Sequence, residues 1–357
     1  MRRLPGVVPF VLLAASAAAI VAVLVPLTPS YDLDVFLRAG NALLHGRNVY
    51  PAPGSAAVYS GHSFVYPFVS AWPFVLLAAI PHALARGVFL ALSAIAVVAA
   101  ALGRADRDPW PAVLVLCTAF TITGLQLGAL SPLLLAGAVF VWRLRDRPAA
   151  AGLLAGAVVT SKLFLAPLLL WLILSRRYRA FAWAAASTLC LLALGFLLGP
   201  LGPGGYVHLL SRLGPNEARA GFGPIGALMN LGLSSGMAEA LAALGAAILM
   251  AAAYRRWRRA GDERILFSAA IVASLALSPV VWSHYLALVA AIPIVFELRR
   301  RWFVWLALCS WAIAPPHGVH LHTALLGVTA LGSWLAVAAA AVALELASRV
   351  RPWTGRP

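Results

Sequence analysis

The chain has 357 residues, of which 62% are hydrophobic and only 11% are charged, and its mean hydropathy is +0.91. Apolar runs of about 17 to 25 residues recur along it, each long enough to cross a bilayer, so the composition excludes a soluble globular protein. The net charge of +16 comes from arginines in short runs between apolar segments, which is typical of membrane topology and not of nucleic-acid binding. We therefore expect an all-α polytopic membrane protein.

The first apolar run, 6–26, follows Met-Arg-Arg as the core of a signal peptide would. The stretch "VPLTPSYDLD" after it has no small-x-small cleavage site, so we expect a retained membrane anchor.

Arginine clusters set the expected orientation, because basic loops stay on the cytoplasmic side. They place both termini inside. The clusters are Arg2/Arg3, Arg143/Arg145/Arg147, Arg176/Arg177/Arg179, Arg255/Arg256/Arg258/Arg259, Arg299/Arg300/Arg301 and Arg349/Arg351.

The chain is expected to form one transmembrane domain, 1–357, of about twelve helices. Because both termini are expected inside, segment 110–142 must cross an odd number of times. We expect a short or re-entrant piece at 110–124 and then one crossing, with "GRADRD" outside and "RLRDR" inside. The other expected crossings are 6–26, 66–82, 86–102, 148–162, 164–175, 180–199, 237–253, 263–280, 285–298, 302–314 and 322–346.

Two neighbouring spans are short. The chain rises and returns on either side of Lys162 in about 13 residues each, roughly 20 Å of helix against a bilayer core of about 30 Å. We expect a recess below the outer surface, with Lys162 and Pro167 near its floor.

The unusual polar residues fall on the expected outer face, within the loops 27–65 and 200–236 and in "GLQLGALS", "SPVVWSHY" and "PPHGVHLH". Residues 34–45 and 206–213 alternate apolar and polar side chains at helical spacing, which predicts amphipathic helices lying on the interface. Chemistry is therefore expected outside.

Two aspartates begin the first of these amphipathic helices. An acidic pair at a helix start is often an N-cap and a first-turn charge, and this structural reading stays open for each residue. Asp34 has Arg38 four residues on and can pair with it. Asp32 has no such local partner, so it is the candidate general base, with a pKa raised by a half-buried cleft.

Lys162 is the only lysine in the chain. A lysine near a helix end often snorkels to the interface, but Lys162 lies away from the basic loops, and an ionisable residue at this depth favours a functional role. We expect it to bind a phosphate as a point charge.

His284 follows a helix-breaking Ser-Pro pair at the outer end of a span. A structural, hydrogen-bonded histidine and a functional one are both open interpretations. His317, His320 and His322 have metal-compatible spacing, but no carboxylate is near, so no metal site is expected.

Five motifs occur in an order that resembles the GT-C membrane glycosyltransferases of family 87, which are polyprenol-phosphate-mannose-dependent mannosyltransferases of actinobacteria and include arabinofuranosyltransferases. The motifs are "YDLDVFLRAGNALLHGRNVYP", "FVYPFVSAWPFVLLAAIP", "GLQLGALSPLLLAGAVF", "AAGLLAGAVVTSKLFLAPLLLWLILSRRYRA" and "LALSPVVWSHYLAL", and they cover residues 1 to about 300.

The resemblance implies a GT-C-like bundle in which Asp32 is the base and His284 is a second catalytic residue. It also implies substrate binding by Asp34, Tyr66, Gln126 and Lys162. This chain departs from the family at Phe68, where a second proline is usual, and at Gly128, where an asparagine is usual.

The expected reaction is a single displacement: an acceptor hydroxyl, deprotonated by Asp32, attacks the anomeric carbon of a polyprenyl-phosphate sugar. The partners are that lipid donor, a glycolipid or glycan acceptor and membrane lipids, with no cofactor and no nucleic acid. The expected location is the plasma membrane, with an extracytoplasmic active site. Two alternatives stay open: a non-catalytic polyprenyl-phosphate carrier or flippase, and a structural subunit of an envelope-assembly complex.

Overall fold

The computed structural model describes residues 30–52, 63–103 and 108–314, together with the isolated positions 11, 15, 55 and 58, and for 214–216 it describes the backbone alone. The expected crossings 6–26 and 322–346, and the three histidines between 317 and 322, lie outside the described residues.

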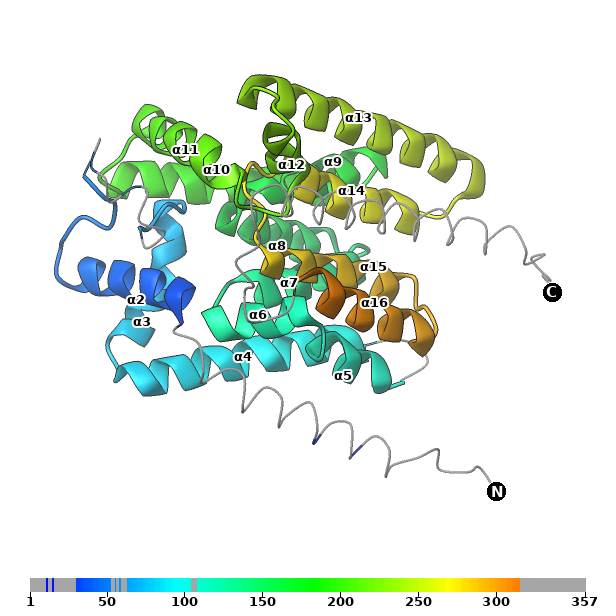
Figure 1. Cartoon of the computed structure of the whole chain (residues 1–357), viewed down its shortest axis with the longest axis horizontal. Coiled ribbons are helices and arrows are strands. Elements are labelled where there is room, and N and C mark those ends of the chain that lie inside the picture. The colour runs from blue at the N-terminus through cyan, green and yellow to red at the C-terminus, as the bar shows by residue number, and fades with distance from the viewer. Residues whose placement is uncertain are drawn as a thin grey trace.

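The described residues form fifteen α-helices and three 3-10 helices, as Figure 1 shows, so the all-α prediction is confirmed for this part of the chain. In chain order they are α2 (Tyr31–Leu44), η3 (Phe68–Ala71), α3 (Trp72–Ala78), α4 (His82–Leu102), α5 (Trp110–Leu116), α6 (Ala119–Leu127), α7 (Ser131–Arg143), α8 (Pro148–Ser161), η4 (Leu163–Leu165), α9 (Pro167–Leu174), α10 (Tyr178–Leu198), α11 (Pro203–Ala218), α12 (Pro224–Asn230), α13 (Ser235–Ala260), α14 (Arg264–Leu277), η5 (Ser283–Ala290), α15 (Ala291–Val295) and α16 (Arg300–Ile313).

Three helices, α4, α10 and α13, are long and apolar enough to cross a bilayer alone. The pair α5 and α6 passes the same test as one unit bent by 59°, which makes four candidate spans among the described residues. Apolar helices of 10 to 17 residues make up much of the remaining bundle. These helices make the chain an integral membrane protein, and the two amphipathic helices expected in the loops are present as α2 and α11.

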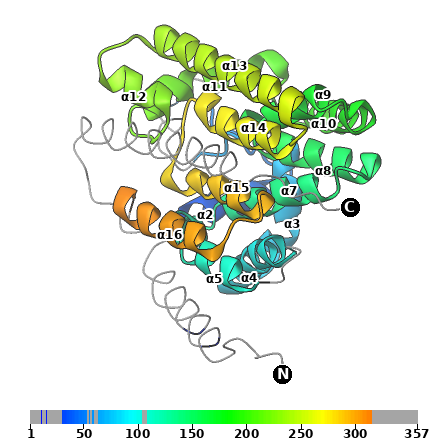
Figure 2. The same ribbon diagram turned by 90° about the vertical axis from the view of Figure 1, so that its right-hand side faces the viewer.

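Loops carrying the arginine clusters meet at one end of the bundle, at the right of Figure 1 and facing the viewer in Figure 2. There the Arg177 guanidinium donates to both carboxylate oxygens of Glu263, with its Nε 2.6 Å from Oε1, and to the backbone oxygen of Arg145 at 2.6 Å. A cavity of about 670 Å³ lies among these loops and is lined by Arg143, Arg264 and their neighbours. The arginine end is thus tied together by ion pairs across three loops.

The opposite end holds α2, α3 and α11, at the left of Figure 1. The Tyr206 hydroxyl of α11 donates to the Val65 backbone oxygen at 3.1 Å, and Phe222, after α11, donates its N–H to the Val281 oxygen at 2.6 Å. Segments that the sequence placed together on the outer face therefore do meet at one end.

The segment 66–82 is not the continuous span that we expected. Pro67, Pro73 and Pro81 divide it into η3 and α3, because proline removes a helix donor and clashes with the preceding turn. It stays beside α2: the Phe74 ring stacks on Phe36, with centroids 4.4 Å apart, and His82 bonds to Asp34 at the start of α4.

The residues that flank "GRADRD" also lie at the other end of the bundle from the one expected. The Arg143 guanidinium donates to the backbone oxygens of Ala99 and Ala100, and Gly103 lines the arginine-end cavity. The flanks of "GRADRD" are thus at the arginine end. Its two arginines balance its two aspartates, so the positive-inside rule gave no signal, and the miscounted span at 66–82 reversed its placement.

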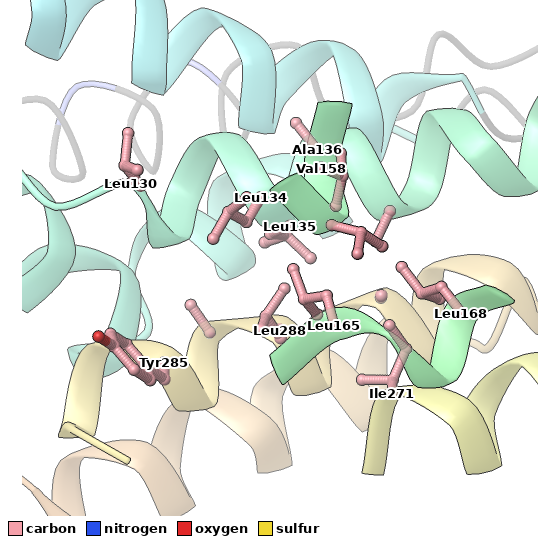
Figure 3. Close-up of a cluster of buried hydrophobic side chains, with 14 of the residues drawn as sticks. Leu130, Leu134, Leu135, Ala136, Val158, Leu165, Leu168, Ile271, Tyr285 and Leu288 are labelled. Atoms are coloured by element: carbon pink, nitrogen blue, oxygen red, sulfur yellow. The ribbon is translucent and has the colours of Figure 1, made fainter. Parts of the chain in front are cut away.

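Small residues let α8 approach α10 closely. A Cβ at Gly156 would lie 2.9 Å from the Ala184 backbone oxygen, and one at Gly152 would lie 3.0 Å from the Ala184 nitrogen. Small-xxx-small spacing is a common interface between membrane helices. The bundle centre is then filled by leucines of α7, η4, α9 and η5 (Figure 3), and the Tyr285 hydroxyl lies at the edge of this cluster.

Candidate active site

Helix α2 brings Asp32 to the bundle. Asp32 and Asp34 lie in its first turn, where the helix dipole favours negative charge, and Ser30 is the N-cap residue. The fully buried side chains of Leu33 and Phe36 fix the helix against its neighbours. The Asp32 side chain, 26% exposed, lies at the buried edge of this helix.

A break between two short helices presents Lys162. α8 ends at Ser161, Lys162 takes an extended conformation (φ −149°, ψ 100°), and η4 begins at the next residue. The Lys162 side chain is 8% exposed, so the interpretation that it snorkels to the surface is wrong. The two short helices meeting at Lys162 were predicted correctly; the recess they were expected to leave stays a prediction.

The Lys162 ammonium lies between two phenols. Its Nζ donates to the Tyr66 hydroxyl at 3.1 Å and to the Tyr285 hydroxyl. Nζ is also 4.3 Å from the centroid of each ring, so each tyrosine offers the ammonium both a cation–π contact and a hydrogen-bond acceptor.

His284 enters from a third break. α14 ends at Leu277, and residues 278–282 are irregular until η5 begins at Ser283, as the Ser-Pro pair predicted. The imidazole is 2% exposed, and its Nε2 lies 3.5 Å from Oδ2 of Asp32. Within the described part of the chain, neither ring nitrogen has a hydrogen-bond partner. A buried imidazole without a hydrogen bond is costly, so its Nε2 is open to a bond with a ligand or with the carboxylate beside it.

The electrostatic setting of Asp32 suits a base. Burial raises the pKa of its carboxyl group to about 6, and the positive charge of Lys162 offsets only part of that rise. Burial also raises the pKa of Glu217 on α11, and the nearby Asp32 charge raises it further. The carboxylate of Asp32 is thus a stronger proton acceptor than an ordinary aspartate.

Asp34 points to a different partner. Its Oδ1 lies 2.7 Å from Nε2 of His82, the first residue of α4, and 3.4 Å from the Ser30 hydroxyl. The i, i+4 spacing to Arg38 gave no hint of this long-range pair. Asp34 therefore ties α2 to α4 near the surface, while Asp32 lies with Lys162 and His284.

Gln126 is fully buried in α6, beside the site. Two residues earlier, a Cβ at Gly124 would lie 3.6 Å from the His284 Cβ. At the end of α6, Gly128 has φ +65°, and a Cβ there would lie 2.5 Å from the Cβ of Leu33. Glycine in place of the usual asparagine thus lets α6 abut α2 next to Asp32.

Three contributors were not identified from the sequence. Tyr285 bonds Lys162, Glu217 lies near enough to Asp32 to feel its charge, and His82 bonds Asp34. Tyr285 directly follows His284 in "WSHY", so its position beside a candidate residue was the one available signal. The other two pairings depend on tertiary contacts that local spacing does not reveal.

The cluster joins a carboxylate of raised pKa, an ammonium and an unpartnered imidazole. A base can activate a hydroxyl, and an adjacent cation can stabilise an anionic leaving group. Among the described residues, no group of three or more His, Cys, Asp or Glu side chains is arranged to hold a metal ion.

The sequence profile of glycosyltransferase family 87 matches residues 64–283, more than half of the chain. The match contains Tyr66, Gln126 and Lys162, begins after Asp32 and ends one residue before His284. No curated protein and no solved structure matches the chain.

Proposed function

The chain belongs to glycosyltransferase family 87 and is therefore a transferase, and we propose that it moves a mannosyl or arabinofuranosyl unit from a polyprenyl-phosphate donor to a glycolipid or glycan acceptor. The observation that carries this proposal is the juxtaposition of Asp32, His284 and Lys162, which come from three distant parts of the chain.

Asp32 acts as the base. The acceptor hydroxyl binds near its carboxylate and loses its proton to Oδ2 as the hydroxyl oxygen attacks the anomeric carbon. Because Oδ2 and Nε2 of His284 are 3.5 Å apart, one hydroxyl oxygen lying about 2.8 Å from each would contact both. His284 thus orients the acceptor against the base.

Lys162 stabilises the leaving group. As the bond between the anomeric carbon and the phosphate oxygen breaks, its electron pair stays on the phosphate, and a buried ammonium offsets the new charge more strongly than one in water. The products are the glycosylated acceptor and polyprenyl phosphate, with one proton left on Asp32. Asp34, Tyr66 and Gln126 complete the substrate-binding part of this proposal.

The proposed topology has twelve crossings, with both termini cytoplasmic and the site extracytoplasmic. Segment 66–82 no longer counts as a span, and a second crossing between 110 and 143 replaces it. The number of crossings therefore stays even, and every arginine loop stays on the cytoplasmic side in this proposal. The crossings are 6–26, α4, α5 with α6, α7, α8, η4 with α9, α10, α13, α14, η5 with α15, α16 and 322–346.

The decisive experiment incubates the purified full-length protein with polyprenyl-phosphate mannose or polyprenyl-phosphate arabinose and a panel of mannoside and arabinan acceptors. The proposal expects a glycosylated acceptor and free polyprenyl phosphate in equal amounts. Transport of the lipid between leaflets without any transfer would instead favour the carrier or flippase, for which a base beside an imidazole has no use.

A further inference from the structure

Tyr285 contributes a hydroxyl that the proposed mechanism has not used. The residue is buried at 8% exposure, and its phenol oxygen accepts a hydrogen bond from Lys162. Its ring also packs edge-to-face with the His284 ring, with centroids 4.7 Å apart and planes at 79°. Tyr285 therefore contacts both the cation and the imidazole of the site.

Both phenol rings around Lys162 are held in place by phenylalanines. Phe164, two residues after the lysine, stacks on Tyr285 with centroids 5.4 Å apart and planes at 18°. Phe36, on the helix that carries Asp32, packs on Tyr66 with centroids 4.6 Å apart. The rings have little freedom to turn, so the directions of their hydroxyl groups are set in advance.

The hydrogen atoms of this group can be counted. The ammonium has three and each phenol has one. Two ammonium hydrogens go to the phenol oxygens. One N–H of the ammonium and the O–H of each phenol remain to donate.

The two phenols are not equivalent. Tyr285 also contacts the His284 ring, whereas Tyr66 packs on Phe36 of α2. The Tyr285 oxygen accepts from the Lys162 ammonium, which polarises its own O–H bond. Tyr285 is thus the phenol that lies beside both the cation and the imidazole of the site.

We propose that the Tyr285 hydroxyl, beside the remaining N–H of Lys162, donates a hydrogen bond to a phosphate oxygen of the prenyl donor. This assignment rests on the proposed function and adds a second donor to the phosphate site. A phosphate held by an ammonium alone is held as a point charge, whereas an added directional donor fixes which oxygen faces the cation.

The test measures binding, not turnover. The purified full-length chain is titrated with geranylgeranyl monophosphate and, separately, with geranylgeraniol, which has the same prenyl chain without the phosphate. The variants are Tyr285→Phe and Tyr66→Phe, each of which keeps its ring. Tyr206→Phe is the matched control, because its buried hydroxyl donates to the backbone oxygen of Val65.

We expect Tyr285→Phe to weaken monophosphate binding about 10- to 100-fold, as for the loss of a hydrogen bond to a charged group, and to leave alcohol binding unchanged. Tyr66→Phe should lose clearly less, and Tyr206→Phe should stay within about twofold of the wild type. Unchanged alcohol binding also reports that each variant is folded.

Two results would overturn the assignment. Equal losses of monophosphate affinity in Tyr285→Phe and Tyr66→Phe would mean that both phenols only position Lys162. Wild-type monophosphate affinity in Tyr285→Phe would exclude a donor role for its hydroxyl. Either result leaves the glycosyltransferase proposal standing. Failure of the wild-type chain to bind the monophosphate would instead remove the proposed function and this assignment together.

Discussion

Nε2 of His284 lies 3.5 Å from Oδ2 of Asp32, although one residue begins the first described helix and the other follows α14 near the end of the bundle. Two breaks in helical structure and one helix N-terminus converge on this pair. Each break was visible in the sequence, and only folding brings them together.

Lys162→Ala should reduce kcat/KM for the lipid donor by about 30- to 1000-fold, which corresponds to about 2 to 4 kcal/mol of lost transition-state stabilisation. Lys162→Arg should recover only part, because a planar guanidinium does not fit where two phenols surround a compact ammonium. Steady-state kinetics with varied donor concentration would measure both. Unchanged turnover in Lys162→Ala would leave the lysine with a packing role only.

The candidate residues were predictable because each accompanies a local signal. Asp32 begins an amphipathic segment, Lys162 is the only lysine and separates two short apolar runs, and His284 follows Ser-Pro. Such signals come from composition and helix-breaking chemistry, which act within a few residues.

The partners of these residues were not predictable. Tyr285 reaches Lys162 from across the chain, and His82 reaches Asp34 from a helix that was expected to begin later. The span count failed locally for a related reason: hydropathy alone made 66–82 long enough to cross, and the packing of α3 on α2 decides otherwise.

Transfer should depend on pH through Asp32. Because burial raises the pKa of its carboxyl group to about 6, kcat/KM should rise about tenfold per pH unit below pH 6 and level off above it. Among the described residues, the charged or titratable groups near this carboxylate include Lys162 on the α8–η4 break, Glu217 on α11, His284 and Tyr285 on η5, and Tyr66 before η3. A rate independent of pH between 4 and 8 would contradict this assignment.

The same pKa predicts a stability effect. The folded-state pKa lies above the usual 3.8, so ionising Asp32 costs free energy in the folded protein. That cost is absent below about pH 4, grows as the pH rises toward 6 and is complete above it. Asp32→Asn should therefore raise the midpoint of thermal unfolding at pH 8 and leave it nearly unchanged at pH 4. Thermal unfolding of the detergent-solubilised protein at the two pH values would measure this. A lower midpoint for the variant at pH 8 would contradict a buried, ionised carboxylate.

The topology can be tested by cysteine labelling in a chain whose Cys117, Cys190 and Cys309 have been replaced. A cysteine at Gly204, exposed on α11, should react with a membrane-impermeant reagent added outside intact cells. Cysteines at Ala260 and Asp108, both at the arginine end, should react only after permeabilisation. The reverse pattern would put the site on the cytoplasmic side.

The most direct measurement compares Asp32→Asn with Asp34→Asn in the purified protein, using one lipid-linked sugar and one acceptor. Removing a general base costs about 10²- to 10⁴-fold in rate, so Asp32→Asn should lose nearly all transfer while still binding geranylgeranyl monophosphate. Asp34→Asn should lose much less activity, because its carboxylate pairs with His82 near the surface, where such a pair contributes little, and its proposed part is in substrate binding and not in proton transfer. An active Asp32→Asn enzyme beside a silent Asp34→Asn enzyme would contradict the account.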